Sequence, residues 1–266
     1  MSFLQLCRCS TIVYIVLAVL IFLPSCRSNQ VPEPVKKELL IYCGISMVAP
    51  VRVIADHIEQ QENCIIKIII NGSGRLYRSI VVNQQGDLYL PGSESYMNKS
   101  VTNELVSETA PVGFNRAAFI VAKGNPLHIS SDLQNILNPE YRVVLGAPDS
   151  GSIGKETKNI LSEINIYDRA LAKALYLTND SKGLSEAIIN NRADLVINWQ
   201  ATTVWSANKN KMEAILLRDD LSPPRKLFLG LLRFSKHPEI ARKYMEYAAS
   251  PSGQQAFSDY GFGEIK

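Results

Sequence analysis

The hydrophobic pattern of residues 38–90 alternates between strand-like runs and helix-like periodicity. Three short apolar runs predict buried strands, and these are ELLIYC (38–43), IIKIII (65–70) and DLYL (87–90), the last closed by Pro91-Gly92. Between them, apolar residues recur at the spacing of amphipathic helices, at Val51, Ile54, Ala55 and Ile58 and then at Leu76, Ile80 and Val81. This β-α-β-α-β order predicts a parallel sheet with right-handed crossovers.

The same alternation returns after residue 115. Further predicted strands are AAFIVAKG (117–124), RVVLG (142–146), ADLVIN (193–198) and LFLGLL (227–232). Helices are predicted to open after Gly154, to run from about Asp168 to Leu177, to begin near Gly183, and to span Pro238–Ala249 and Gly253–Tyr260. Ile240, Tyr244, Tyr247 and Ala248 give the first C-terminal helix its buried stripe. We therefore expect an α/β protein.

An unbroken apolar run from Ile12 to Leu23 lies near the N-terminus, after Arg8 and before Ser25 and Cys26. A charged start, an apolar middle and a small residue before the cleavage point are the order of a signal peptide. The run has twelve residues, whereas a membrane-spanning helix needs about 20. We therefore predict that residues 1–25 are a signal peptide and that the chain is exported.

Leu23-Pro24-Ser25-Cys26 resembles the lipobox of bacterial lipoproteins, although Pro24 departs from it. The resemblance implies that Cys26 is diacylated and becomes the mature N-terminus. It also implies an anchor to a bacterial membrane, on the periplasmic side or the outer cell surface. The stretch that follows is polar and holds two prolines, so residues 26–35 are predicted to form the lipidated cysteine and a flexible tether.

Charge gives no sign of a nucleic-acid partner. Removing residues 1–25 takes away one cation, Arg8, and no acid, which leaves 27 basic and 25 acidic residues and a net charge of +2. The sequence has no basic run and no basic-aromatic stripe. About 230 residues follow the tether, enough for one large domain or for two lobes of roughly 100 residues.

Cysteines and histidines predict neither a disulfide nor a metal site. Cys43 ends one predicted strand and Cys64 begins the next, so parallel neighbours would hold these ends about 15 Å apart. We therefore expect two buried free thiols. The histidines are scattered, without cysteine or carboxylate partners at metal-ligand spacing. No metal and no other cofactor is expected.

Serine and glycine gather at four joints between predicted strands and helices, where ligands bind in open parallel sheets. The joints are Gly44-Ile45-Ser46-Met47, Asn71-Gly72-Ser73-Gly74, Asp149-Ser150-Gly151-Ser152-Ile153-Gly154 and Asp180-Ser181-Lys182-Gly183. Each helix start offers unpaired N–H groups and about half a positive charge, and serine adds a hydroxyl donor. One such joint is ordinary turn chemistry, but four together predict a site for a small anion.

The sequence does not contain two known catalytic motifs at their required spacing. Gly151 to Thr157 hints at a phosphate loop, but that motif needs a hydroxyl residue directly after Lys155, where the chain has Glu156. The glycine-x-serine-x-glycine elbow of hydrolases does not occur either. We therefore predict no catalytic residues and a binding protein rather than an enzyme.

Four segments carry a resemblance to a known family. They are GISMVAP (44–50), NGSGRLYRSI (71–80), VGFNRAAFIVAKGNP (112–126) and SKHPEIARKYMEYAASPSGQQAFSDYGF (235–262). These segments resemble two serine turns, the crossover between lobes and the C-terminal helix pair of the molybdate- and tungstate-binding proteins of ABC importers. That family lies within the type II periplasmic binding proteins. The resemblance runs from about Leu39 to Phe262 and implies a two-lobed fold, each lobe a mostly parallel sheet flanked by helices.

The resemblance also implies ligand-binding residues. Ser46 and Ser73 would donate from the first lobe, and Ser152 and Ile153 from the second, Ile153 through its backbone N–H. The fourth contact falls at Ser181 or Lys182, and the family's binding tyrosine aligns with Trp199.

Two departures bear on the ligand. Trp199 offers an indole N–H, which cannot accept a hydrogen bond, and a larger ring; it could instead be a core aromatic at a strand end. Leu90-Pro91-Gly92-Ser93 stands where the family usually has serine, alanine and an acid. Both departures count against molybdate as the predicted ligand more than they count against the predicted fold.

These observations predict lobe 1 from residues 36–114 and 223–266 and lobe 2 from 115–222, with a hinge near Asn115 and Pro223-Pro224. We expect a monomeric solute-binding lipoprotein of an ABC importer that captures a tetrahedral oxyanion, molybdate or tungstate first, and passes it to a membrane permease. Another small anion, phosphate-like or organic, remains an alternative ligand, with Asp149 or Asp180 as an acceptor unless these residues cap helices. Two further hypotheses for the function are a ligand-sensing module for a membrane sensor and an enzyme on the same fold.

Overall fold

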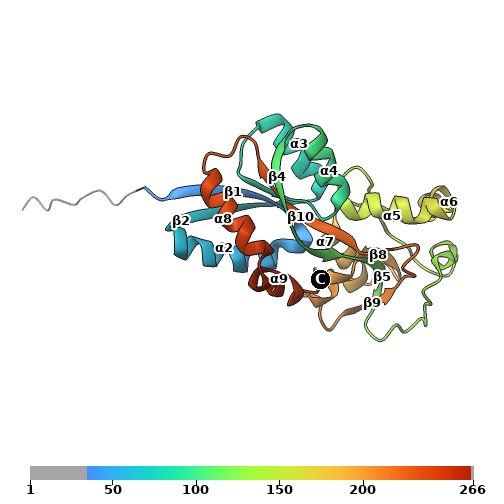
Figure 1. Cartoon of the computed structure of the whole chain (residues 1–266). Coiled ribbons are helices and arrows are strands. Elements are labelled where there is room, and N and C mark those ends of the chain that lie inside the picture. Colours follow the sequence, from blue (N-terminus) through green and yellow to red (C-terminus); the bar gives the residue numbers. More distant parts are fainter. Residues whose placement is uncertain (1–34, 265–266) are drawn as a thin grey trace, which may run out of the picture. The chain divides into compact units, whose positions relative to one another are not determined.

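The computed structural model describes residues 35–264 (Figure 1). The predicted signal peptide (1–25), Cys26 and the tether up to residue 34 lie outside the described residues. Within residues 35–264, no helix is both long enough and apolar enough to cross a membrane.

The first sheet has five strands in the order β2-β1-β3-β10-β4. Their bounds are β1 Lys37–Gly44, β2 Cys64–Asn71, β3 Leu88–Leu90, β4 Val106–Asn115 and β10 Arg225–Leu232. β1 runs parallel to β2 and β3, as the β-α-β-α-β pattern predicted, whereas β10 pairs antiparallel with β3 and β4. The chain therefore returns to the first sheet at its C-terminal end through a strand of opposite direction.

Helices cover both faces of this sheet (Figure 1). One face packs on α2 (Val48–Glu62), α8 (Pro238–Ala249) and α9 (Pro251–Ser258), and the other on α3 (Ser73–Asn83) and α4 (Glu94–Thr102). Leu39, Ile41 and Cys43 of β1 join the core under α2, and Tyr42 joins the core under α3. Burial on both faces explains why this strand reads as a continuous apolar run.

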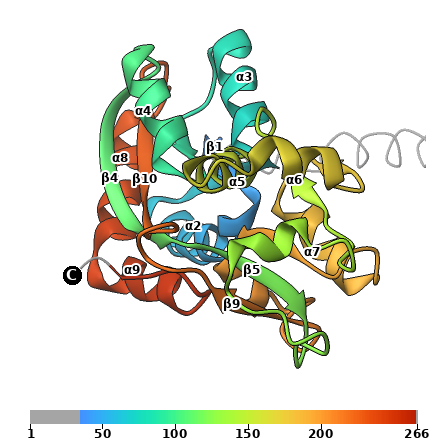
Figure 2. The same ribbon diagram turned by 90° about the vertical axis from the view of Figure 1, so that its right-hand side faces the viewer.

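A second set of strands has its own hydrophobic core, and Figure 2 views the side on which its helices lie. β5 (Ala117–Ala122) pairs antiparallel with β8 (Val196–Trp199) and β9 (Met212–Leu216), and β6 (Leu145–Gly146) pairs parallel with β7 (Leu177–Thr178). The helices are α5 (Ser152–Glu163), α6 (Tyr167–Lys173) and α7 (Ser181–Ile189). Short 3-10 turns are η2 (Ile45–Met47), η3 (Leu133–Leu137) and η4 (Gln200–Val204). We call β1 to β4, β10 and their helices the first-sheet region, and β5 to β9 with theirs the second-sheet region.

The structure corrects several sequence expectations. The sheets are mixed rather than mostly parallel, because β10, β4 and the partners of β5 pair antiparallel. β2 is an edge strand whose Ile65, Ile69 and Ile70 stay largely exposed, not a fully buried strand. Val81 is 41% exposed, since α3 buries only the stripe through Leu76 and Ile80.

Two helix boundaries also differ. α5 begins at Ser152, two residues before the predicted opening after Gly154, because Gly151 takes an extended N-cap conformation. The predicted helix at 168–177 stops at Lys173, since Leu177 pairs with Leu145 as part of β7. At the C-terminal end, α8 has the predicted bounds and α9 lies two residues earlier than predicted.

Cys43 and Cys64 are both buried and free, in agreement with the sequence prediction. The register places Cys64 beside Lys37, six residues along β1 from Cys43. At about 3.3 Å per residue, this separates the two thiols by roughly 20 Å along the strand, which no disulfide can span.

Candidate functional site

A small cavity lies between the two regions, at the carboxyl ends of β1, β2 and β3. Its lining residues are Gly44, Ile45, Ser46, Asn71, Gly72, Ser73, Gly92, Gly151, Ser152, Ile153, Asp180, Ser181 and Trp199. The cavity has about 220 Å³ of empty volume, open solvent at its mouth included. Because part of that volume is open solvent, the enclosed space is smaller still and suits only a small solute.

The four serine-glycine joints of the sequence meet in this cavity. Ser73, Ser152 and Ser181 are the first residues of α3, α5 and α7, and Ser46 lies in η2, directly before α2. Gly72 and Gly151, the N-cap residues of α3 and α5, provide no side-chain cap. Helix starts have N–H groups without intrahelical partners and a partial positive charge, so these ends present donors to the cavity.

Two of the serine hydroxyls already accept a hydrogen bond. The oxygen of Ser73 accepts from the backbone N–H of Gly92 at 2.9 Å, and that of Ser152 accepts from the indole Nε1–H of Trp199 at 3.4 Å. A hydroxyl has one proton to donate. Because each oxygen is held by an N–H, the proton of each hydroxyl is left for another acceptor.

Ser46 and Ser181 supply two further hydroxyls. Their residues are 4% and 3% exposed. Within residues 35–264, neither hydroxyl makes a hydrogen bond to the protein. Neither oxygen is among the fully buried polar atoms without a partner in the described chain, so both hydroxyls remain accessible from the cavity and can donate to a ligand there.

Charged side chains in the fourth joint are committed to other contacts. One oxygen of Asp180 accepts from the backbone N–H groups of Lys182 and Gly183 at 2.9 and 3.0 Å, so Asp180 caps α7. The ammonium of Lys182 is exposed and lies 3.7 Å from Glu186, outside the cavity lining. Of the two residues that the sequence left open for the fourth contact, the cavity contains Ser181.

Trp199 lies in the cavity wall and is only 1% exposed. The fully buried Asn198 holds it in place by accepting from its backbone N–H at 2.9 Å. The same amide donates to the carbonyl of Ser181 at 2.9 Å and to the hydroxyl of Ser185 at 3.2 Å. Asn198 was not predicted as a site residue, although a lone amide at the end of the apolar run ADLVIN was a signal for it.

Tyr89 plays a similar positioning role in the first-sheet region. Its phenol is fully buried and donates to the carbonyl of Ser73 at 3.1 Å. Burial raises the pKa of Tyr89 well above its usual value, so the phenol stays a neutral donor. The backbone N–H of Gly92 donates to the hydroxyl of Ser73, a contact that was not predicted. A side chain at this position would clash, because an added Cβ would overlap Oγ of Ser152.

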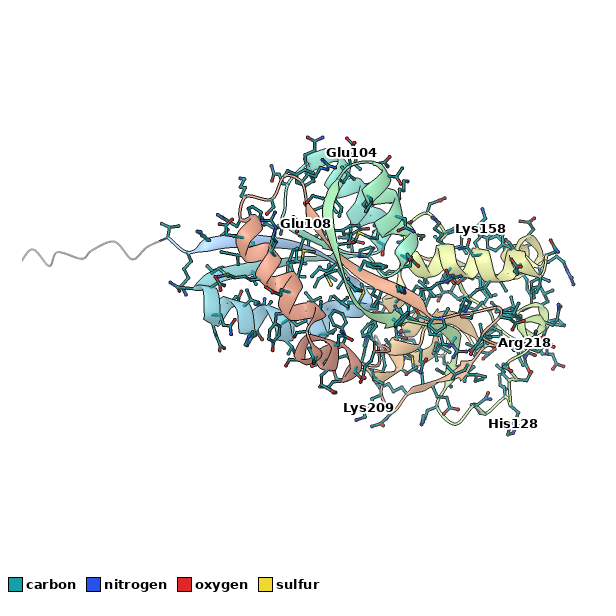
Figure 3. All side chains as sticks on the ribbon, viewed as in Figure 1. Glu104, Glu108, His128, Lys158, Lys209 and Arg218 are labelled. Carbon is teal, nitrogen blue, oxygen red and sulfur yellow. The ribbon has the colours of Figure 1, made fainter. Side chains whose placement is uncertain are left out.

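Charge is concentrated at the surface rather than in the cavity. Lys158 of α5, Lys209 and Arg218 project outward (Figure 3). No basic side chain is among the cavity-lining residues of the described chain. Within residues 35–264, no three histidine, cysteine, aspartate or glutamate side chains gather as metal ligands. The cavity is therefore lined by hydroxyls, N–H groups and helix starts, with Asp180 as the one charged side chain among its lining residues.

Comparison with known proteins identifies the family. The family described as "Bacterial extracellular solute-binding protein" matches residues 39–263. A Haemophilus influenzae protein named "Putative binding protein" is 25% identical over 226 residues, covering 85% of this chain and 90% of its own. The Bacillus subtilis "Putative ABC transporter substrate-binding lipoprotein YvgL" is 22% identical over 254 residues, covering 92% of this chain and 95% of its own.

Solved structures share the type II periplasmic binding protein fold. The periplasmic molybdate-binding protein of Azotobacter vinelandii has a TM-score of 0.73 at 13% identity, covering 86% of this chain and 100% of its own. The sulfate-binding protein SubI of Mycobacterium tuberculosis has a TM-score of 0.74 at 14% identity, covering 86% and 88%. Proteins named for thiamin and for bound L-phospholactate have TM-scores of 0.74 and 0.66 at 16% and 17% identity. Fold, cavity and family match agree, and the chain belongs to the bacterial extracellular solute-binding proteins, a family of binding proteins rather than enzymes.

Proposed function

We propose that the chain is the solute-binding lipoprotein of an ABC importer and that it captures a small tetrahedral oxyanion, molybdate or tungstate first. The observation that carries the proposal is a cavity made of donors. Ser46, Ser73, Ser152 and Ser181 bring hydroxyl protons to one place, and helix starts add backbone N–H groups, including that of Ile153. An anion with four oxygens can accept from all of them.

The donor set favours an anion without a proton. Molybdate, tungstate and sulfate are dianions without a proton near neutral pH, whereas monoprotonated phosphate or arsenate needs an acceptor for its own hydroxyl. The cavity's one carboxylate, Asp180, accepts two backbone N–H groups through one of its oxygens. A protonated oxyanion would meet mostly donors, with the second oxygen of Asp180 as the one carboxylate acceptor for its hydroxyl.

Some structural neighbours are named for oxyanions and others for organic ligands, so the names alone do not identify the ligand. One structural neighbour is named for molybdate and another for sulfate. Others are named for thiamin and L-phospholactate. The small size of the cavity favours a compact ligand over an organic one. The sequence resemblance to molybdate-binding proteins puts molybdate and tungstate before sulfate.

Binding is proposed to close two lobes, residues 36–114 with 223–266 and residues 115–222. The register of β4 and β10 supports a hinge at this boundary, because Asn115 pairs with Arg225 and both connections between the lobes run side by side. A change from mostly open to mostly closed needs a preference of about 5.5 kcal/mol. Four charge-assisted hydrogen bonds at about 1.5–3 kcal/mol each would exceed that.

Lipidation of Cys26 is proposed to hold the monomeric protein at the membrane, near the permease that receives the ligand. A tether of about nine residues raises the effective concentration of receptor beside its membrane partner. The lipoprotein name of the Bacillus subtilis relative supports this proposal.

The test is calorimetric titration of residues 36–266 with molybdate, tungstate, sulfate and phosphate in turn. Molybdate and tungstate should release heat with one-to-one stoichiometry, and phosphate should give none. Absence of heat with all four anions would overturn the oxyanion proposal. Tight binding of phosphate alone would overturn the assignment of a site made mainly of donors.

A further inference from the structure

The two regions meet backbone to backbone at the rim of the cavity. A Cβ added at Gly72 would lie 2.5 Å from the carbonyl oxygen of Ser150 and 3.1 Å from that of Asn179. A Cβ at Gly74 would lie 2.6 Å from the carbonyl oxygen of Asp149. Side chains essentially never approach other atoms this closely, and a backbone carbonyl cannot rotate away as a side chain can. We call this contact the closure seam.

The conformation of the first-sheet region does not itself require these glycines. Gly72 has φ −64° and ψ 143°, an extended conformation open to any residue, and Gly74 lies inside α3. Glycine inside a helix is less favourable than alanine. The demand for glycine therefore comes mainly from atoms of the second-sheet region.

Side-chain contacts run along the same seam. Arg78 of α3 donates from Nη1 to the carbonyl oxygen of Asp149 at 2.9 Å. The ammonium of Lys155 lies 5.4 Å from the ring centre of Tyr96 on α4. Both contacts join α3 and α4 to the loop and first turn of α5, beside the serines that line the cavity.

We propose that Gly72 and Gly74 determine how far the two lobes close, and that a single methyl group at either position acts as a wedge that holds the anion cavity open. The inference rests on the proposed closure around an anion. Each region would still fold with the wedge in place, but the donors of α3 and those of α5 and α7 could no longer reach the same ligand.

The experiment compares the wild-type residues 36–266 with Gly72→Ala and Gly74→Ala, using sodium molybdate as the probe. We expect each variant to bind molybdate at least tenfold more weakly, while the ligand-free melting temperature of Gly74→Ala is unchanged or raised. Small-angle scattering should show that molybdate compacts the wild type but neither variant. Wild-type affinity in both variants, or a large loss of ligand-free stability in Gly74→Ala, would overturn the proposal.

A second variant separates the seam from a local effect. A Cβ at Gly74 would also lie 2.7 Å from the phenol oxygen of Tyr96, which belongs to the first-sheet region. Adding Tyr96→Phe to Gly74→Ala removes that oxygen but leaves the carbonyl of Asp149 in place. Molybdate binding should remain weak in the double variant, and its recovery would assign the effect to Tyr96 and overturn the wedge.

The experiments distinguish a wrong oxyanion proposal from a wrong proposal about Gly72 and Gly74. If the wild type binds none of the four anions, the oxyanion proposal fails. The seam is then decided by scattering in a concentrated osmolyte, which favours compact states and should compact the wild type but neither glycine variant. Equal radii would overturn the seam.

Discussion

The indole N–H of Trp199 donates to the hydroxyl oxygen of Ser152 across 3.4 Å. This contact leaves the hydroxyl proton of Ser152 free to donate, so we propose that Trp199 orients a donor for the ligand. We predict that Trp199→Phe lowers molybdate affinity by about 2- to 13-fold, the equivalent of one neutral hydrogen bond of about 0.5–1.5 kcal/mol. Calorimetry measures the effect. Unchanged affinity for molybdate, tungstate and sulfate would show that Trp199 is only a core aromatic.

Substitutions of Ser181 and Lys182 test which of these two residues at the start of α7 contacts the ligand. Ser181→Ala should weaken molybdate binding by about 13- to 160-fold, because it removes a charge-assisted hydrogen bond of about 1.5–3 kcal/mol. Lys182→Ala should stay within about twofold, since its ammonium lies beside Glu186, outside the cavity. Ser79→Ala, on α3 but outside the cavity lining, is a matched serine control. The opposite ranking of the two α7 variants would contradict the site.

Sequence periodicity predicted the elements that bury a regular stripe but not those that are half exposed. β4 (Val106–Asn115) has exposed polar residues and Pro111 at the sheet edge, so it lacks an apolar run. α4 is mostly polar, so it has no clear apolar stripe. The five-residue sequence of β9, MEAIL, would fit a short piece of helix equally well. The antiparallel direction of β10 depends on partners more than 100 residues away in the chain, which local patterns do not encode.

The site was predictable where it consists of helix starts and unpredictable where distant backbone segments meet. Ser46, Ser73, Ser152 and Ser181 follow from strand-to-helix joints, which parallel sheets bring to one edge. The role of Gly92 depends on its hydrogen bond to Ser73, 19 residues earlier in the chain, and on the nearby hydroxyl of Ser152. At α7, the cap of Asp180 places Ser181 and not Lys182 in the cavity lining, a one-residue difference that the sequence left open.

The ion pair of Asp194 with Arg142 predicts a pH-dependent stability. Hydrogen bonds from Arg142 hold the pKa of Asp194 below its usual value. A carboxylate with a lowered pKa stabilises the fold above its unfolded pKa of about 3.9, and the contribution is lost as pH falls through the folded pKa. Asp194→Asn should lower the free energy of unfolding by about 1 kcal/mol at pH 7, because Arg142 is 43% exposed and solvent screens the pair. The difference from wild type should shrink below about pH 4 in urea titrations.

Asp220 provides the control for that experiment. It pairs with Arg218 through a similar hydrogen bond, but both side chains are largely exposed. Solvent screening makes exposed pairs weak, so Asp220→Asn should change stability little at any pH. If both substitutions lowered the free energy of unfolding equally, burial of Asp194 would not explain the strength of its ion pair.

Cys43 and Cys64 should be unreactive in the folded protein. Burial raises the pKa of both thiols, and only the thiolate reacts readily. In residues 36–266 these are the only cysteines. A chromogenic disulfide reagent should therefore titrate no thiol in buffer and two in guanidinium chloride. Rapid reaction of either thiol in buffer would contradict its burial.

Cys26→Ser tests the proposed anchor. The full-length chain expressed in a bacterium should incorporate labelled fatty acid and sediment with membranes. The variant should incorporate none and appear in the soluble extracytoplasmic fraction. Equal labelling of both proteins would contradict lipidation at Cys26.

The claim that four serine-bearing helix starts enclose a tetrahedral oxyanion is tested most directly by crystallography with tungstate. An anomalous difference map locates the tungsten atom without reference to protein contacts. One strong peak is expected in the cavity, with tungstate oxygens at hydrogen-bonding distance from Ser46, Ser73, Ser152, Ser181 and the N–H of Ile153. A peak elsewhere, or an empty cavity at saturating tungstate, would contradict it.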